Sequence, residues 1–381
     1  MVLRSDPWVV LPIARCLGGF LSAAPHARFL NGNFGALMDA CGTSDPFIRS
    51  WIDYLAFALS GLDSRGTLGA AVSFTLGDLY TPGATLDYPR GGGGAVIDAL
   101  IRGLRAHGGE LRTRAHVEEI LIEDGRAVGV RLKGGEVVRA ASVVSNADAW
   151  NTAKLLPDKY RPPARPRAGG ALNAALPPTP SFMHLHIGIR GDNLPAGLGI
   201  HYSVLLDGLS DIEKEQNMVI ISIPTLLDPS LAPEGKHVLH AYYAANEPYE
   251  PWAGVRRGSD EYRALKEERS QRLWEAVERI IPDVRERVEV EMVGSPLTHE
   301  RFLRRHAGTY GPPVFIGEET LPFAATPVPG LLHCGDSTFP GIGVPAASAS
   351  GMNAANTLVS PLEQLKLMDE LNEMDALLPT R

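Results

Sequence analysis

One stretch near the carboxyl end, residues 331–356, carries the residue types that suit ligand binding. Residues 331–334 form an apolar run that predicts a short buried strand, and Gly335 and Asp336 follow at its end. A Pro/Gly-rich loop then leads into a helix of small residues that begins near Val344. The first turn of a helix has free N–H groups and a positive dipole end, so it favours an electron-rich or anionic group. Asp336 is placed to accept hydrogen bonds from a sugar-like hydroxyl.

The same stretch contains an apparent dinucleotide fingerprint. Residues 341–346 fit G-x-G-x-x-A, and Glu363 lies about twenty residues further on, as the fingerprint requires. The context differs, because six residues separate Cys334 from Gly341 and a polar helical pattern, not a second strand, carries Glu363. The glycine run at residues 91–94 does not fit this fingerprint either, since no strand pattern precedes it. The sequence therefore contains no Rossmann-type G-x-G-x-x-G start.

Bulk composition narrows the class of partner. The 381 residues suffice for two domains with real cores. The net charge of −8 and the lack of a basic run with interleaved aromatics exclude a nucleic-acid partner. The three cysteines lie far apart and show neither metal spacing nor a disulfide framework, which favours a reducing compartment over secretion.

The amino-terminal segment is apolar but too short for a membrane span. No apolar run reaches the roughly 20 residues that a span needs, and two prolines and Asp6 make residues 1–13 a poor signal peptide. Residues 8–21 could contact a membrane surface or line an apolar tunnel. Core packing is the simpler interpretation.

Residues 1–87 have a helical pattern. Ser44-Asp45-Pro46 is a helix start, and the i, i+4 spacing of Phe47, Trp51, Leu55 and Leu59 predicts one apolar face. Residues 68–80 predict a second helix after a glycine-containing break. These helices form an apolar layer, in which Trp51 and Tyr54 are expected in the core.

Residues 88–150 change to short strands after one helix. The helix is predicted over 95–107, and Gly108-Gly109 ends it. Asx-Gly and Gly-Gly turns between alternating runs indicate hairpins. The predicted strands are 110–114, 117–122, 127–132, 137–140 and 142–147.

An antiparallel sheet is expected in the second half. Its predicted strands are 182–190, 201–206, 219–225 and 237–243, and one more strand is predicted over 287–293. A charged helix is predicted over 259–281, and the Pro-rich residues 162–180 predict a loop. The fold class is therefore mixed, α/β with α+β character.

No catalytic residue can be named from spacing. His184 and His186 alternate along one strand and face one side, but no third ligand is placed beside them, so no metal site is predicted. Neither a Ser-His-Asp arrangement nor a pair of catalytic carboxylates is indicated. That absence suits an enzyme in which a cofactor carries the chemistry.

Several segments together resemble the carotenoid isomerase and phytoene desaturase family of flavoproteins, which includes retinol-saturase-like oxidoreductases. Tyr88-Pro89-Arg90-Gly91-Gly92 is similar to the family's Y-P-x-G-G segment, and residues 335–343 with the following helix are similar to its C-terminal flavin motif. Further similar segments are 107–111 with 117–130, 145–147 and the loop 308–312.

The resemblance implies FAD as cofactor and a long apolar polyene as substrate. It implies that Asp336 lies near the ribityl chain and pyrophosphate, that the backbone of 342–345 faces the pyrimidine ring, and that Val117 meets the adenine. The implied cofactor-binding residues are Val117, Ser145, Asn146, Ala147, Gly335, Asp336, Ile342, Gly343, Val344, Pro345 and Ala346.

The resemblance also implies a domain plan. It is a partial FAD/NAD(P)-binding domain of the flavin amine oxidase type plus a substrate domain with an antiparallel sheet and helices. Residues 88–154 and 325–360 would form the flavin part. Residues 1–87 and 155–324 would form the substrate domain, and 361–381 a tail.

One departure from the family leaves three hypotheses open. The family begins with a βαβ unit whose glycine-rich turn holds the FAD pyrophosphate, whereas here the Y-P-x-G-G segment already comes at residue 88. The chain is then an FAD-dependent polyene oxidoreductase or isomerase, a truncated or split non-catalytic subunit whose partner chain supplies the Rossmann half, or a flavin amine oxidase. The expected location is cytoplasm or plastid, with peripheral membrane contact.

Overall fold

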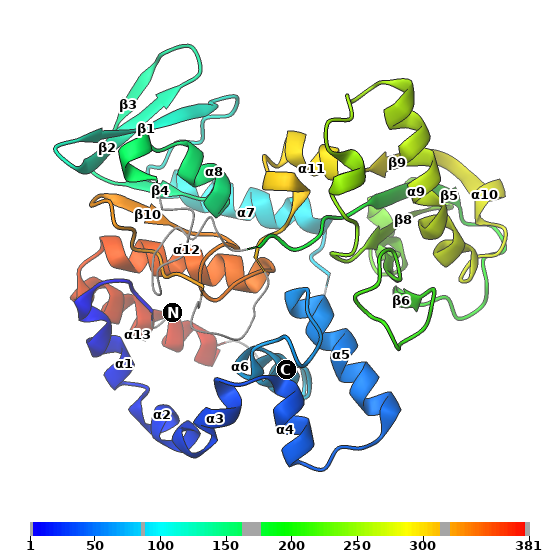
Figure 1. The fold of residues 1–381 in the computed structure, drawn as a ribbon, viewed down its shortest axis with the longest axis horizontal. Helices are drawn as coiled ribbons and strands as arrows, with labels where there is room; N and C mark the ends of the chain where they lie inside the picture. Colours follow the sequence, from blue (N-terminus) through cyan, green and yellow to red (C-terminus); the bar gives the residue numbers. More distant parts are fainter. Residues whose placement is uncertain (1–2, 85–87, 162–176, 313–320, 378–381) are drawn as a thin grey trace. The chain divides into compact units, whose positions relative to one another are not determined.

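The structure is a computed structural model that describes residues 3–84, 88–161, 177–312 and 321–377. The chain divides into two compact units (Figure 1). Unit 1 comprises Met1–Ala84, Ala115–Thr179 and Tyr310–Arg381, and unit 2 comprises Thr85–Arg114 and Pro180–Thr309.

Unit 2 is built on a five-stranded antiparallel sheet in the order β6-β7-β8-β5-β9. This confirms the predicted sheet, with shifts of only a few residues at the strand ends. The strands are β5 (His184–Arg190), β6 (His201–Leu205), β7 (Met218–Ser222), β8 (Lys236–Tyr243) and β9 (Val288–Gly294).

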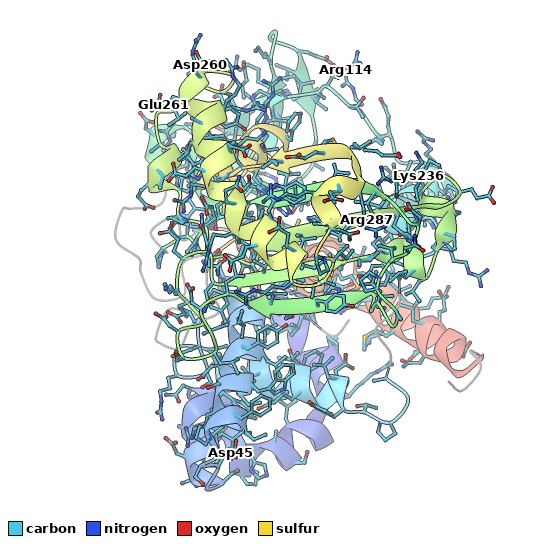
Figure 2. The ribbon with its side chains drawn as sticks, turned by 90° about the vertical axis from the view of Figure 1, so that its right-hand side faces the viewer. Asp45, Arg114, Lys236, Asp260, Glu261 and Arg287 are labelled. Atoms are coloured by element: carbon cyan, nitrogen blue, oxygen red, sulfur yellow. The ribbon has the colours of Figure 1, made fainter. Side chains whose placement is uncertain are left out.

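The core of unit 2 lies between one face of this sheet and α9 (Asp260–Glu278). Burial alternates along β5, so Leu185, Ile187 and Ile189 enter the core while their neighbours face the other way. Figure 2 shows α9 lying across the sheet with Asp260 and Glu261 at its N-terminal end, where acidic residues suit the helix dipole. The predicted charged helix is confirmed.

The rest of unit 2 consists of short helices and turns. They are α7 (Gly92–Ala106), α10 (Val284–Arg287) and α11 (Pro296–Phe302). The start of α7 is held by Asp228, whose Oδ2 accepts a 2.9 Å hydrogen bond from the Gly91 N–H. The strand predicted at residues 110–114 is wrong: these residues follow the Gly108-Gly109 stop without strand structure, because alternation alone does not supply a pairing edge.

Unit 1 contains two small sheets. One is antiparallel, in the order β1-β2-β3, from β1 (Val117–Glu123), β2 (Arg126–Leu132) and β3 (Val137–Arg139). The other pairs β4 (Val143–Ser145) with β10 (Leu331–His333) in parallel. Asp124 and Gly125 join β1 to β2, as expected for an Asx-Gly hairpin turn.

The described part of unit 1 also contains α-helices. They are α1 (Val10–Ala14), α2 (Leu17–Ala23), α3 (Ala27–Leu30), α4 (Phe34–Ala40), α5 (Pro46–Ser60), α6 (Gly69–Leu79), α8 (Ala149–Lys154), α12 (Val344–Leu358) and α13 (Pro361–Leu377). Asp45 caps α5 by accepting from the Ile48 N–H at 3.0 Å, and Pro46 occupies its first turn. The predicted helix starts at 44–46 and near 344 are thus confirmed. Most of the loop predicted at 162–180 lies outside the described residues.

The predicted apolar face of α5 is packed only in its second half, where Leu59 contacts the cluster that contains Ala56 and Val72. Phe47 and Trp51 are 62% and 39% exposed, whereas Ala56 and Phe57 are buried. Trp51 stacks on Tyr54 with ring centroids 5.1 Å apart, at the surface and not in the core. Spacing identified an apolar stripe, but the contact with Val72 of α6 centres on Ala56, beside the C-terminal half of the stripe.

The expectation that residues 8–21 pack in a core is also wrong. Within α1 only Pro12 is buried, and α2 contains no buried residue. Trp8, Leu17 and Phe20 are more than half exposed. Among the described residues no single helix is long and apolar enough to cross a membrane; the segments Pro7–Ala14 and Leu17–Leu30 reach that length only together, across an 85° bend.

Candidate cofactor site

The carboxyl ends of β4 and β10 lie side by side. The parallel register sets His333 opposite Ser145, and the Cys334 N–H donates a 2.9 Å hydrogen bond to the Ser145 carbonyl oxygen. The residues that follow each strand, Asn146 and Gly335, therefore emerge at the same edge. Ligands of α/β sheets bind at the carboxyl ends of parallel strands, so this edge is a natural binding position.

Gly335 is required by the close approach of the two strand ends. Its φ of +103° lies in the region that favours glycine, and a Cβ there would lie 2.5 Å from Oδ1 of Asn146. Its N–H donates a 2.7 Å hydrogen bond to Oγ of Ser350 on α12. Gly335 thus joins both strand ends to the helix that follows the motif.

Buried polar groups below the edge hold it in place. His333 is fully buried, and its Nε2 donates to the Ala147 carbonyl oxygen at 2.7 Å. Burial lowers the pKa of His333, so the imidazole stays neutral and donates from Nε2. The Ser145 hydroxyl lies 2.8 Å from Oγ1 of Thr152, which ties the end of β4 to α8. Sequence reasoning missed His333, although a histidine inside an apolar run was a usable signal.

The start of α12 is open to a ligand. The first backbone hydrogen bond of the helix runs from the Ala347 N–H to the Gly343 oxygen at 2.9 Å, so the N–H groups of Val344 and Ala346 precede it. Val344 is 78% exposed, and Gly343 and Pro345 are exposed as well. A flat group can therefore approach this backbone directly.

Residues behind the helix start are packed. Ile342 is buried and lies in a cluster with Leu321 and Tyr310. A Cβ on Gly311 would lie 2.8 Å from Cγ2 of Ile342 and 3.1 Å from the backbone carbonyl oxygen of Asp336. The loop that resembles the family's Gly-Thr-Tyr-Gly-Pro segment therefore contacts the C-terminal motif.

The structure thus brings most of the predicted residues into one connected group. That group consists of Ser145, Asn146, Ala147, Gly335, Asp336, Ile342, Gly343, Val344, Pro345 and Ala346. Val117 opens β1 in the other sheet, opposite Leu132, and its place beside an adenine stays a prediction. So do the individual cofactor contacts of the group.

The rejected dinucleotide fingerprint finds no structural support. Glu363, the acid that would bind a ribose, lies in the first turn of α13 and not on a strand. Its Oε2 accepts a 2.9 Å hydrogen bond from the Ser360 N–H, and its own N–H donates to Oγ of Ser360 at 3.2 Å. These Ser360 hydrogen bonds lower the pKa of Glu363. Glu363 therefore caps a helix.

Comparison with known proteins decides the family. The model of the flavin containing amine oxidoreductases matches residues 24–359. The chain belongs to the flavin-containing amine oxidoreductase family. The matched range includes both strand ends and the start of α12.

Carotenoid enzymes are among the curated relatives of this family member. A chloroplastic prolycopene isomerase of Daucus carota is 35% identical over 84% of this chain and 51% of its own length. The chloroplastic prolycopene isomerase of Arabidopsis thaliana is 35% identical over 88% of this chain and 56% of its own. The chain spans about half the length of these relatives.

A solved structure supports the fold. The crystal structure of an oxidoreductase from Methanosarcina mazei matches 92% of this chain and 73% of its own, with a TM-score of 0.56 and 21% sequence identity. Together with the family match, this likeness confirms the mixed fold of the flavin amine oxidase type.

FAD is the cofactor that this family implies, and the residues present fit one end of it. The exposed start of α12 offers backbone N–H groups, and a Cβ placed on Gly343 would meet only the ring of Pro345, at 4.0 Å. Space and donors are thus available for the electron-rich side of the flavin ring.

Proposed function

We propose that this chain forms the flavin-ring end and the substrate part of an FAD-dependent oxidoreductase or isomerase acting on a long apolar polyene of carotenoid or retinoid type. The observation that carries the proposal is the intact group of β4 and β10 strand ends with an open α12 start. It occurs in a chain 35% identical to two prolycopene isomerases. The proposed location is a reducing compartment, plastid or cytoplasm.

The residues of the chain have defined tasks in this proposal. Bound flavin would supply hydride acceptance and return. The Val344 and Ala346 N–H groups would bind the ring edge where negative charge gathers on reduction. Asp336, at the strand end, would accept a hydrogen bond from a hydroxyl of the ribityl chain. Gly335 and His333 would keep these elements in register through their hydrogen bonds to Ser350 and Ala147.

The test separates this proposal from the two alternatives. Purified chain is mixed with FAD, filtered, and scanned for flavin absorbance; reduced flavin and a poly-cis carotenoid in detergent are then added, and isomers are separated by chromatography. We expect FAD-dependent change in the polyene and no peroxide release with polar amines. Amine-dependent peroxide would favour a flavin amine oxidase. If neither a flavin band nor polyene turnover is seen, this chain does not act as an enzyme by itself. That result would favour a subunit whose partner chain supplies the Rossmann half.

We further propose that the exposed apolar helices α1 and α2 contact a membrane surface. Residues 7–30 contain no acidic residue, and Phe20 and Leu21 are 55% and 65% exposed. Their two arginines are Arg15, which pairs with Asp369 of α13 at 2.6 Å, and Arg28. Apolar side chains together with basic ones suit the interface of an anionic bilayer.

Replacing Phe20 by serine is expected to weaken binding to anionic phospholipid vesicles about tenfold, because one buried apolar side chain contributes roughly 1.5–3 kcal/mol. Vesicle co-sedimentation measures the effect. Phe74→Ser is the matched control, since Phe74 on α6 is 77% exposed outside α1 and α2. Equal binding of both variants and the unmodified chain would contradict the membrane contact.

A further inference from the structure

A cluster of imidazoles lies on the sheet of unit 2, on the face turned away from α9. His184 and His186 alternate with the core residues of β5, and the antiparallel register places His240 of β8 directly opposite His186. His299 of α11 approaches the same point, with its ring centroid 4.7 Å from that of His184. Three separate elements therefore bring histidines to one place.

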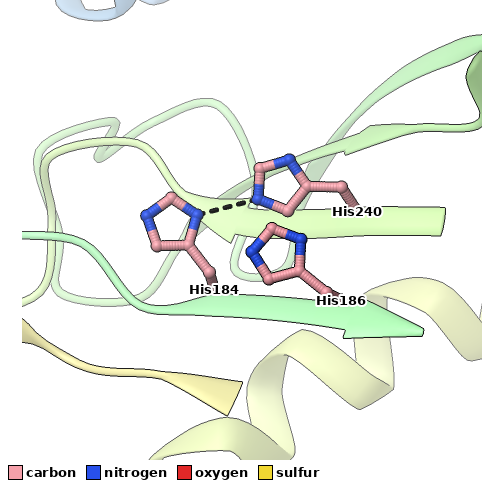
Figure 3. A group of neighbouring side chains, drawn as sticks. All are labelled: His184, His186 and His240. Atoms are coloured by element: carbon pink, nitrogen blue, oxygen red, sulfur yellow. Dashed lines mark hydrogen bonds between the residues drawn. The ribbon is translucent and has the colours of Figure 1, made fainter. Parts of the chain in front are cut away.

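The geometry of three of these rings brings their nitrogens together (Figure 3). Nδ1 of His184 lies 2.8 Å from Nε2 of His240, and the rings of His186 and His240 stack with centroids 4.2 Å apart. One nitrogen from each of the three residues lies within 4.8 Å of the others. Two imidazole nitrogens at 2.8 Å share either one proton or one cation.

The cluster contains an unpaired buried nitrogen. Nε2 of His184 is buried and has no hydrogen-bond partner among the described residues, and the same holds for Nε2 of His299. These are not the nitrogens that meet at the cluster, because His184 faces His240 through Nδ1. An ion bound at Nδ1 would leave Nε2 of His184 with the ring proton.

The imidazoles are neutral near pH 7. Burial lowers the pKa of His184 well below its ordinary value, lowers that of His240 to about 3, and lowers that of His186. Neutral imidazole is the form that binds a metal ion.

We propose that His184, His186 and His240 bind one divalent transition-metal ion of the zinc type. Among the described residues this group contains three imidazoles and neither a carboxylate nor a thiolate, which disfavours calcium and magnesium. Zinc–nitrogen bonds of about 2.0–2.1 Å hold tetrahedral ligand nitrogens roughly 3.3 Å apart. His184 and His240 would separate slightly and His186 would turn toward them. Three protein ligands leave the fourth position open.

An entry path exists beside the site. His186 lines a pocket of about 380 Å³ together with Val238 and Met292. The ion and a water or small ligand in the fourth position can therefore reach His186 from this side. The proposal does not depend on flavin binding, because all three histidines belong to unit 2.

The experiment measures zinc bound to the purified full chain. Protein is freed of metal with a chelator, equilibrated with Zn²⁺, passed through a desalting column and analysed by atomic emission. Co²⁺ then serves as a spectroscopic probe of tetrahedral nitrogen ligation. We expect one Zn²⁺ per chain, unaffected by excess Mg²⁺, and at least tenfold weaker binding in His240→Gln and in His186→Phe. The phenyl ring of the second variant keeps the stacking.

The matched control is His237→Gln. His237 lies on the same strand, β8, but its Nδ1 is paired with Oγ1 of Thr225 at 2.9 Å, so its loss should leave zinc binding unchanged. Circular dichroism and melting temperature establish that each variant is folded. Substoichiometric zinc in the unmodified chain, or equal loss in His237→Gln and the two cluster variants, overturns the proposal.

Discussion

Replacing Glu247 by alanine is expected to destabilise unit 2 by about 3–5 kcal/mol, the usual cost of removing one partner from a buried ion pair. The Glu247 side chain is fully buried and pairs with Arg269. Its Oε1 also accepts from Nε1 of Trp252 at 2.7 Å, and its Oε2 accepts from Nε2 of Gln216 at 3.0 Å. The substitution leaves all three donors without this acceptor. The lost stability is measured by urea unfolding followed by tryptophan fluorescence.

Glu215 provides the comparison, since it pairs with the same arginine from the surface. Its side chain is 51% exposed, so Glu215→Ala should cost under about 1 kcal/mol. Burial would lower the pKa of Arg269, but hydrogen bonds to Glu247 and Glu215 hold it above its ordinary value. In Glu247→Ala the pair with Glu215 remains, and a guanidinium stays protonated in proteins, so Arg269 is still charged in this variant. Equal losses in the two variants would show that burial of Glu247 contributes nothing to the stability of unit 2.

Local signals in the sequence were enough to identify most elements. The helix start at Asp45-Pro46 and the alternation along β5 both depend on neighbouring residues, and both are confirmed. The strand predicted at 110–114 failed because a strand needs a partner, which no local pattern provides. The burial of Trp51 in α5 was predicted wrongly for a related reason. Trp51 and Phe57 are both apolar, and only tertiary contacts determine that Phe57 is the buried one.

The cofactor group was predictable because its signals are contiguous. Gly335 and Asp336 follow a strand, and Gly343 precedes a helix of small residues, so one stretch of sequence already describes strand end, loop and helix start. Ser145 to Ala147 joined that group only through the family resemblance. Their position beside Gly335 depends on the parallel pairing of β4 with β10, which spans nearly 200 residues of sequence (143–145 with 331–333).

The histidine cluster shows the opposite case. Alternation places His184 and His186 on one face, but the third ligand comes from β8, whose adjacency depends on strand order and register. His240 lies 54 residues after His186, and no motif spacing joins them. In the sequence, His184 and His186 therefore lacked a third metal-binding histidine, whereas strand pairing in the sheet places His240 beside them.

Gly335→Ala tests whether the strand ends and the start of α12 act as one group. A side chain at φ +103° is strained by roughly 1–3 kcal/mol, and the added Cβ would lie 2.5 Å from Oδ1 of Asn146. A penalty of about 1.4 kcal/mol corresponds to tenfold in an equilibrium constant, so FAD retention should fall tenfold or more. Flavin absorbance after gel filtration measures retention, and the melting temperature gives a readout that does not require FAD.

Gly351→Ala is the matched control within α12. A Cβ at Gly351 meets nothing within 4 Å, and the residue lies in the helix interior, where alanine is favoured over glycine by roughly 0.5–1 kcal/mol. It should therefore leave FAD retention unchanged and keep or raise the melting temperature. The contrast is informative because both substitutions add one methyl group near Ser350. Gly335 donates its N–H to the Ser350 hydroxyl, and Gly351 follows Ser350 in the helix. If Gly335→Ala matched Gly351→Ala in both measurements, the close approach of Gly335 to Asn146 would have no part in holding the flavin end together.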